Sequence, residues 1–211
     1  MPGFTGHSIA GICAGVAVTV ASIELTKTKP PEGVILGLTC YIGSLMPDID
    51  ANRAVITRKF FHYMGILIGV LCSAILFKRL EYYQVMTLVF GSWAVSRYLI
   101  RPVFSKITTH RGLFHSVPAG LVISGMVGNL ILFLNEYRKE LSLSRMNKDF
   151  ILLSCASFLV GYVVHLLLDE SYSIVRMKRS LGTALKFFEK KRFSGYLLMY
   201  ILAAILYLSI W

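Results

Sequence analysis

Long runs of apolar residues, separated by short segments that carry most of the charges, recur along this chain of 211 residues. Seven such runs cover approximately 8–24, 33–46, 61–77, 83–100, 116–135, 150–168 and 195–211. All except the second reach the roughly 17 to 25 residues that an α-helix needs to cross a bilayer. Inside lipid every backbone polar group must be satisfied within the chain, and a helix does this by itself. The pattern therefore predicts an all-α, polytopic membrane helix bundle of about seven transmembrane helices, with residues 1–211 forming a single membrane domain.

The balance of residue types excludes an ordinary soluble domain. Hydrophobic residues make up 55% of the chain, charged residues make up 16%, and the mean hydropathy is +0.65, whereas soluble domains carry about 25% charged residues. The net charge of +11 alone would suit a nucleic-acid partner. However, the Lys and Arg residues lie between the apolar runs, as juxtamembrane charges do. We therefore expect membrane lipid, and no nucleic acid, as the partner.

The distribution of Lys and Arg between alternate loops predicts the orientation in the membrane. One set of loops contains Arg53, Arg58, Lys59, Arg97, Arg101, Lys106, Arg111, Arg176, Lys178, Arg179, Lys186, Lys190, Lys191 and Arg192. The opposite set contains fewer basic residues, namely Lys27, Lys29, Lys78, Arg79, Arg138, Lys139, Arg145 and Lys148. Because positively charged loops tend to stay in the cytoplasm, we expect the first set there. With seven spans the N-terminus lies on the same side.

All five histidines and three of the aspartates fall at this predicted cytoplasmic face. His7 precedes the first run, Asp48 and Asp50 follow the second, His62 opens the third, His110 and His115 precede the fifth, and His165 and Asp169 close the sixth. Zinc, manganese and iron accept imidazole and carboxylate ligands together. We therefore predict a divalent metal site, with zinc favoured and manganese or iron as alternatives. The candidate ligands are His7, Asp48, Asp50, His110, His115, His165 and Asp169.

The spacing of these residues supports shared coordination. His165 and Asp169 are four residues apart, so they project from one helical face with Cβ atoms about 5–6 Å apart. Asp48 and Asp50 follow Pro47 and point the same way in an extended turn, where they supply oxygen ligands or one ligand and a base. The candidates outnumber the set of about three protein ligands that a single catalytic zinc takes. Two or more ions are therefore expected, which suits phosphoester hydrolysis.

Two further features point to a phosphorylated lipid as substrate. Arg111 adjoins the predicted ligands, and its guanidinium matches the geometry of a phosphate. We expect Arg111 to steady a phosphoryl oxyanion, while Asp50 or another free carboxylate orients a water whose pKa the metal lowers toward neutrality. The segment 173–193 alternates basic with apolar residues, so it is predicted to lie in the membrane interface near anionic headgroups.

Structural roles remain open for the single residues. His7 or His62 can serve as a hydrogen-bonded residue at the membrane interface, and Asp48 with Asp50 can cap a turn. Arg111 can be a cytoplasmic anchor, and segment 173–193 an ordinary basic loop. The metal-site hypothesis is preferred because it explains all of these residues together. Without it, several independent structural roles would have to fall on one membrane face by chance.

Two other functions compete with hydrolysis. A metal-ion or proton-coupled transporter would place ionisable residues near the middle of the bilayer, yet the central parts of all seven runs lack charged residues and histidines. A metal-stabilised scaffold would need a closed coordination shell, with no position open to water.

The order of these motifs resembles that of a known family. The chain reads His7, then Pro47-Asp48-Ile49-Asp50, then His110-Arg111-Gly112-Leu113-Phe114-His115-Ser116, and finally His165 with Asp169. This order is similar to that of the YdjM-like inner-membrane proteins, over roughly residues 1 to 190. The resemblance implies a metal-dependent hydrolase of the inner membrane with the ligand set given above. It leaves open whether Asp169 or the adjacent Glu170 coordinates. A more distant similarity is to the helical zinc-dependent phospholipase C and nuclease group.

Overall fold

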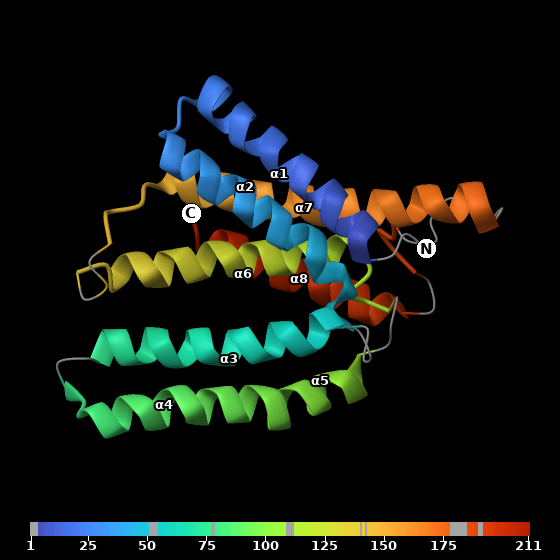
Figure 1. The fold of residues 1–211 in the computed structure, drawn as a ribbon. Helices are drawn as coiled ribbons and strands as arrows, with labels where there is room; N and C mark the ends of the chain where they lie inside the picture. Colours follow the sequence, from blue (N-terminus) through green and yellow to red (C-terminus); the bar gives the residue numbers. More distant parts are fainter. Residues whose placement is uncertain are drawn as a thin grey trace. The chain divides into compact units, whose positions relative to one another are not determined.

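The computed structural model describes residues 4–50, 55–76, 79–108, 112–139, 141, 143–177, 185–189 and 192–211 (Figure 1). Within these residues all regular structure is helical and no strand occurs, which confirms the all-α class. The elements are α1 (Phe4–Thr26), α2 (Pro30–Leu45), the 3₁₀-helix η1 (Met46–Asp50), α3 (Val55–Leu76), α4 (Tyr82–Ala94), the π-helix η3 (Val95–Ile100), α5 (Arg101–Ile107), α6 (Val117–Glu136), α7 (Lys148–Met177) and α8 (Phe193–Leu208).

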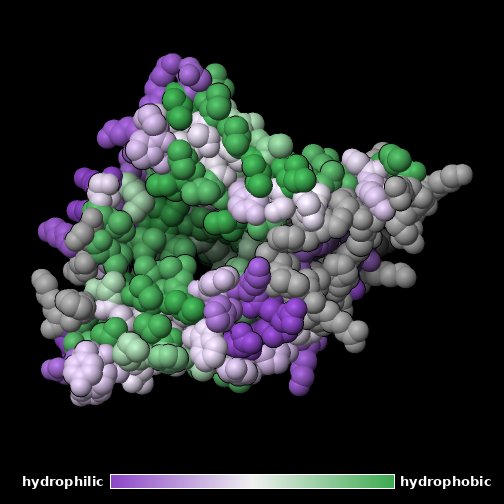
Figure 2. All heavy atoms as spheres, in the orientation of Figure 1, coloured by the Kyte–Doolittle hydropathy of each residue, from purple (hydrophilic) through white to green (hydrophobic). Residues whose placement is uncertain are grey.

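Among the described residues, four helices are long and apolar enough to cross a membrane. These candidate spans are Thr5–Thr26, Thr57–Leu76, Val117–Glu136 and Lys148–Val175. Helices α2 and α8 coincide with two more predicted runs but have 16 residues each. Helix α4 continues without a break through η3 into α5. Apolar side chains cover much of the surface visible in Figure 2, as lipid-facing helices require.

Helix α7 extends beyond the run that predicted it. The apolar run ends near residue 168, whereas α7 continues to Met177. The extension buries Asp169, Glu170 and Ser173, each less than 5% exposed, and the backbone amide of Leu185 donates a hydrogen bond to Glu170 Oε2 at 3.0 Å. Polar side chains that find partners inside the protein allow a helix to continue where hydropathy alone predicts an end.

The chain divides into two compact units. The first comprises residues 1–47, 111–132 and 146–211, and it contains α1, α2, α7, α8 and most of α6. The second comprises residues 48–110 and 133–145, and it contains α3, α4, η3 and α5. In the second unit α3 packs side by side with α4 and η3 as a helical hairpin (Figure 1).

Two hydrophobic centres occur among the described residues of the first unit. One groups Ala119 of α6 with Phe158, Tyr162 and Leu166 of α7. The other groups Ile151 and Cys155 of α7 with Ile210 after α8. Polar contacts join α6 to α8 as well, since Ser124 Oγ lies 2.8 Å from the Tyr207 hydroxyl. Helix α7 is therefore the central support of this unit.

Candidate metal centre

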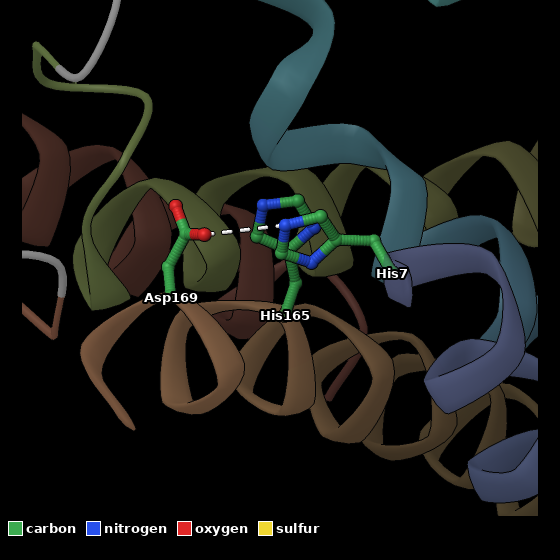
Figure 3. A group of neighbouring side chains, drawn as sticks. All are labelled: His7, His165 and Asp169. Carbon is green, nitrogen blue, oxygen red and sulfur yellow. Dashed lines mark ion pairs between the residues drawn. The ribbon is translucent and has the colours of Figure 1, made fainter. Parts of the chain in front are cut away.

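The carboxylate of Asp169 lies between two imidazole rings that come from distant parts of the first unit. Nε2 of His7, in α1, lies 3.2 Å from Oδ1 of Asp169, and Nε2 of His115, just before α6, lies 3.3 Å from Oδ2. Figure 3 shows His7 reaching from α1 toward Asp169 on α7. All three residues are at most 3% exposed. A buried carboxylate requires such partners, because an isolated charge is costly away from water.

His165 completes this group one helical turn before Asp169. Its ring stacks on that of His7 with centroids 3.8 Å apart, and it meets the ring of His115 edge-on at 5.4 Å. Nδ1 of His165 lies 2.6 Å from the carbonyl oxygen of Ser44. A carbonyl can only accept, so Nδ1 carries the proton and neutral His165 has its lone pair on Nε2. A hydrogen bond of this kind fixes the tautomer and ring orientation that a metal ligand needs.

Glycines allow α1, α2 and α7 to approach closely enough to form the group. A Cβ atom on Gly161, one turn before His165, would lie 1.8 Å from the carbonyl oxygen of Cys40 in α2. A Cβ on Gly11, one turn after His7, would lie 1.9 Å from Ser44 Oγ. The nearest atoms to Gly161 are backbone, so a larger residue there would force α2 and α7 apart, whereas at Gly11 the side chain of Ser44 would have to shift. The backbone contact at Gly161 therefore sets the distance at which His165 reaches Ser44.

The segment that carries His115 is held by hydrogen bonds at both of its sides. The hydroxyl of Tyr162 in α7 donates to the carbonyl of Phe114. Ser116 Oγ accepts the amide of Ala119 at 3.4 Å, so Ser116 caps α6 as its position before Pro118 predicts. The imidazole of His115 is thus presented from a fixed turn to Asp169.

The donor set fits a divalent cation. His7, His165 and Asp169 each offer a ligand atom, and these atoms all lie within 4.8 Å of one another. Two ligands of a tetrahedral zinc ion with bonds of about 2.1 Å lie roughly 3.4 Å apart, so small side-chain rotations would bring the three atoms to one ion. His115 faces the same carboxylate, as a further ligand or as a partner that orients Asp169.

The side chains of Asp169 and Glu170, either of which the sequence allows as the metal ligand, have different surroundings in the structure. Asp169 faces the histidines, whereas Glu170 accepts the amide of Leu185 at 3.0 Å and is 3% exposed. The role of Ser44 had no signal in the sequence, because its contribution is a backbone carbonyl that any residue offers. Only the packing of α2 against α7 reveals it.

The sequence predicts four further site residues, namely Asp48, Asp50, His110 and Arg111. Asp48 is half-buried and belongs to the second unit, and it lies in the 3₁₀-helix η1 rather than in the extended turn that the sequence predicted. The backbone of Asp50 ends η1, but its side chain lies outside the described part of the chain, as do His110 and Arg111. Their roles stay predictions. His62 lies in α3 of the second unit, where its Nδ1 accepts a hydrogen bond from Nε1 of Trp93.

Comparison with known proteins gives a single kind of match. The family model described as YdjM inner membrane protein matches residues 1–185, which include all four residues of the buried group. No curated protein and no solved structure shows a significant match to the chain.

Proposed function

The chain belongs to the YdjM inner membrane protein family, and from this premise we propose that it is a multi-pass membrane hydrolase whose buried histidines and Asp169 bind a divalent metal ion. The single observation that carries the proposal is the convergence on Asp169. His7, His115 and His165 come from three separate segments and all contact this carboxylate or each other. Packing alone does not require three histidines around one buried aspartate.

The four residues have distinct roles in this proposal. His165 offers Nε2, because Ser44 engages its Nδ1. Asp169 contributes carboxylate oxygen and negative charge, and His7 contributes a second imidazole. His115 either joins them or orients Asp169. A divalent ion held by these groups would supply Lewis acidity and make water more acidic near neutral pH. Zinc is the favoured ion, since two imidazoles and one carboxylate form a known catalytic zinc set.

Further ligands would extend the site to a second ion. Asp48, Asp50 and His110 are the candidates from the sequence, and Arg111 is the group proposed to bind a phosphoryl oxygen. Asp50 is the proposed carboxylate that orients the attacking water. Two ions with a bridging ligand suit the in-line displacement at a phosphoester.

The proposed substrate is a phosphoester of a lipid or of another membrane-associated molecule. His7 lies near the beginning of a candidate span, and Asp169 lies near the end of another. A site at helix ends in a membrane protein is at headgroup depth, where phosphoesters are concentrated. The basic segment 173–193 would attract anionic headgroups to this face. The Lys and Arg distribution assigns the face to the cytoplasm, with seven spans and a cytoplasmic N-terminus.

The test combines metal analysis with activity. The protein is purified in detergent, its metal content is measured by mass spectrometry, and hydrolysis of a panel of phospholipids and generic phosphodiesters is followed with and without chelator. We expect bound zinc and a chelator-sensitive activity on at least one phosphoester. Inactivity across the panel, combined with metal-dependent flux in proteoliposomes, would instead establish the transporter.

A further inference from the structure

The second unit contains a cationic and aromatic cluster that plays no part in the proposed metal site. We call it the Arg97 cluster, and it consists of His62 on α3, Trp93 on α4, and Arg97 and Tyr98 on η3. It lies entirely within one unit. Its geometry therefore does not depend on where the histidines of the first unit are placed.

Hydrogen bonds fix the donors of the cluster. Nε1 of Trp93 donates to Nδ1 of His62 at 2.8 Å, and Nη1 of Arg97 lies 3.3 Å from the same nitrogen. An indole nitrogen can only donate, so Nδ1 of His62 is an acceptor and the ring proton is on Nε2. The guanidinium of Arg97 also lies over the rings of Trp93 and Tyr98, at 5.8 Å and 5.7 Å from their centroids. The lone pair on Nδ1 of His62 is already used by Trp93. His62 and Arg97 therefore present only N–H donors to a ligand, and such donors bind an anion and not a cation.

Among the residues that the structure describes, the charge of Arg97 has no acidic counterpart nearby. No carboxylate of the described residues lies within 4.0 Å of it. Helices α3, α4 and α5 and the η3 segment contain no Asp or Glu, whereas they contain Arg58, Lys59, Arg101 and Lys106 besides Arg97. A half-buried guanidinium in a membrane protein is costly without an anion to balance its charge. Cation–π contacts supply about 0.5 to 2 kcal/mol each and leave the N–H donors of the fork available.

The cluster is held in a fixed arrangement. Ser96 Oγ donates to the carbonyl of Phe61 at 2.6 Å, and Ser92 Oγ donates to the carbonyl of Gly65 at 2.8 Å. A Cβ atom on Gly65 would lie 2.8 Å from the Cα of Trp93, so α3 and α4 touch at this level. Arg97 itself lies in a π-helix, a rare element that is frequent at functional sites. These contacts preorganise the donors.

The surroundings of the cluster resemble a membrane interface. Tyr63 and Tyr98 are 63% and 65% exposed, and Leu99 beside them is 61% exposed. In Figure 2 the surface over α3 and α4 is largely apolar, and hydrophilic side chains gather toward the end where α5 begins. Trp and Tyr are enriched where a membrane helix meets the headgroups. An anion that occupies this site must therefore be compatible with lipid on one side and water on the other.

We infer that the Arg97 cluster is a binding site for the phosphate of an anionic phospholipid. The guanidinium of Arg97 and Nε2–H of His62 would donate to the phosphate oxygens, while Trp93 and Tyr98 would pack against the glycerol and the first acyl carbons. This inference does not depend on the proposed hydrolysis, because no residue of the cluster belongs to the metal centre. A free phosphate ion shares the headgroup chemistry but lacks the apolar part.

The test measures lipid binding at Trp93 directly. The chain has two tryptophans, and Trp211→Phe leaves Trp93 as the only fluorophore of this class. The full-length protein in detergent micelles is titrated with brominated phosphatidylglycerol and, separately, with brominated phosphatidylcholine. We expect quenching by phosphatidylglycerol at concentrations about tenfold or more below those for phosphatidylcholine. Equal quenching by the two lipids would overturn the site.

Variants separate a specific site from general positive charge. Arg97→Gln should abolish most of the preference for phosphatidylglycerol, by about tenfold, since it removes the charge-assisted hydrogen bonds. Arg58→Gln removes one exposed positive charge from the same end of the hairpin and should change the preference by about twofold at most, because water and salt screen it. Equal losses in the two variants would overturn the proposal. Where Arg97→Gln is not monodisperse, Arg97→Lys serves instead, and we expect a partial loss from the missing fork.

Inorganic phosphate distinguishes the two sources of the anion. We expect that millimolar phosphate does not displace the brominated phosphatidylglycerol, because the apolar contacts with Trp93 and Tyr98 favour the lipid. Displacement by free phosphate at such concentrations would overturn the lipid assignment and identify an ion site. Bound phosphatidylglycerol detected by native mass spectrometry in the wild type, and reduced in Arg97→Gln, is the second expected result.

Discussion

Nε2 of His7, in the first helix, lies 3.2 Å from Oδ1 of Asp169 in α7, and both side chains are buried. Helices α1 and α7 both pack against α2, and they also contact each other. The ion pair therefore reports the tertiary structure of the first unit as a whole. It also makes each of the two residues a specific probe of the proposed metal centre.

Asp169→Asn should remove metal without unfolding the protein. The amide has the same shape but lacks the negative charge that a divalent cation requires, so we expect metal affinity to fall by about 100-fold or more, given that loss of an outer-shell partner alone costs about 10- to 100-fold. Metal stoichiometry by mass spectrometry measures the effect. The matched control is Asp149→Asn, the same change at an exposed position in the first turn of α7, which should leave stoichiometry at the wild-type value. Full occupancy in Asp169→Asn would exclude this carboxylate as a ligand.

Glu170→Gln should retain the metal. Glu170 accepts the amide of Leu185, and glutamine keeps a carbonyl oxygen for this hydrogen bond. We expect metal content within error of the wild type and, at most, easier proteolysis in the segment after α7. If Glu170→Gln lost metal while Asp169→Asn kept it, the assignment of the two neighbours would have to be exchanged.

Removal of the metal should destabilise the folded protein. A ligand that binds only the native state at 100 times its Kd contributes about 2.7 kcal/mol. For a chain of this size that is a decrease of roughly 5 to 10 °C in Tm, measured by thermal denaturation in detergent with and without chelator. The Asp169→Asn protein should show no such chelator effect. An equal decrease in both proteins would mean that the chelator acts elsewhere.

The helices and half of the site follow from local features of the sequence. Hydropathy located the long apolar helices because a membrane segment depends on its own residues, but it predicted a break at Arg101, where α5 in fact continues from η3. Ser116 before Pro118 marks the start of α6. The spacing of His165 and Asp169 placed both on one face of α7, where they lie. These are properties of the chain within one or two helical turns.

What the sequence could not predict depends on packing between helices. The choice of Asp169 over Glu170 follows from which side of α7 faces His7 of α1, and the close backbone contact of Gly161 with Cys40 shows which side of α7 packs against α2. The hydrogen bond from His165 to the Ser44 carbonyl has no side-chain signature. The sequence places His62 at the same predicted membrane face as the other histidines. It gives no sign of the partner Trp93, which depends on the pairing of α3 with α4.

The orientation can be tested with single cysteines. In a background without the four native cysteines, Lys59→Cys and Lys139→Cys each place a thiol at an exposed position. Because Lys59 belongs to the more basic set of loops, we expect Lys59→Cys to be protected from an impermeant maleimide added to intact cells, and Lys139→Cys to be labelled. Labelling with the opposite pattern would invert the topology and place the metal centre on the outer face.

Gly161→Ala should disrupt the metal centre from a distance. The added Cβ would lie 1.8 Å from the carbonyl oxygen of Cys40 and 3.0 Å from the amide nitrogen of Ser44. Both atoms belong to the backbone, so a change of side-chain rotamer cannot relieve the clash. Helices α2 and α7 must separate, at a cost of about 1–3 kcal/mol or more for overpacking. The Ser44 carbonyl then moves away from His165, so metal affinity should fall together with Tm.

Gly91→Ala provides the matched control for this helical glycine. A Cβ at Gly91 has no neighbour within 4 Å, and alanine favours the helix over glycine by up to about 1 kcal/mol. We expect its Tm to be unchanged or slightly higher, with full metal content. If Gly161→Ala lowered Tm but bound metal as tightly as Gly91→Ala, the close approach of α2 and α7 would matter for folding and not for the ligand geometry. If Tm and metal affinity both fell in Gly161→Ala and neither fell in Gly91→Ala, helix packing would be shown to position His165.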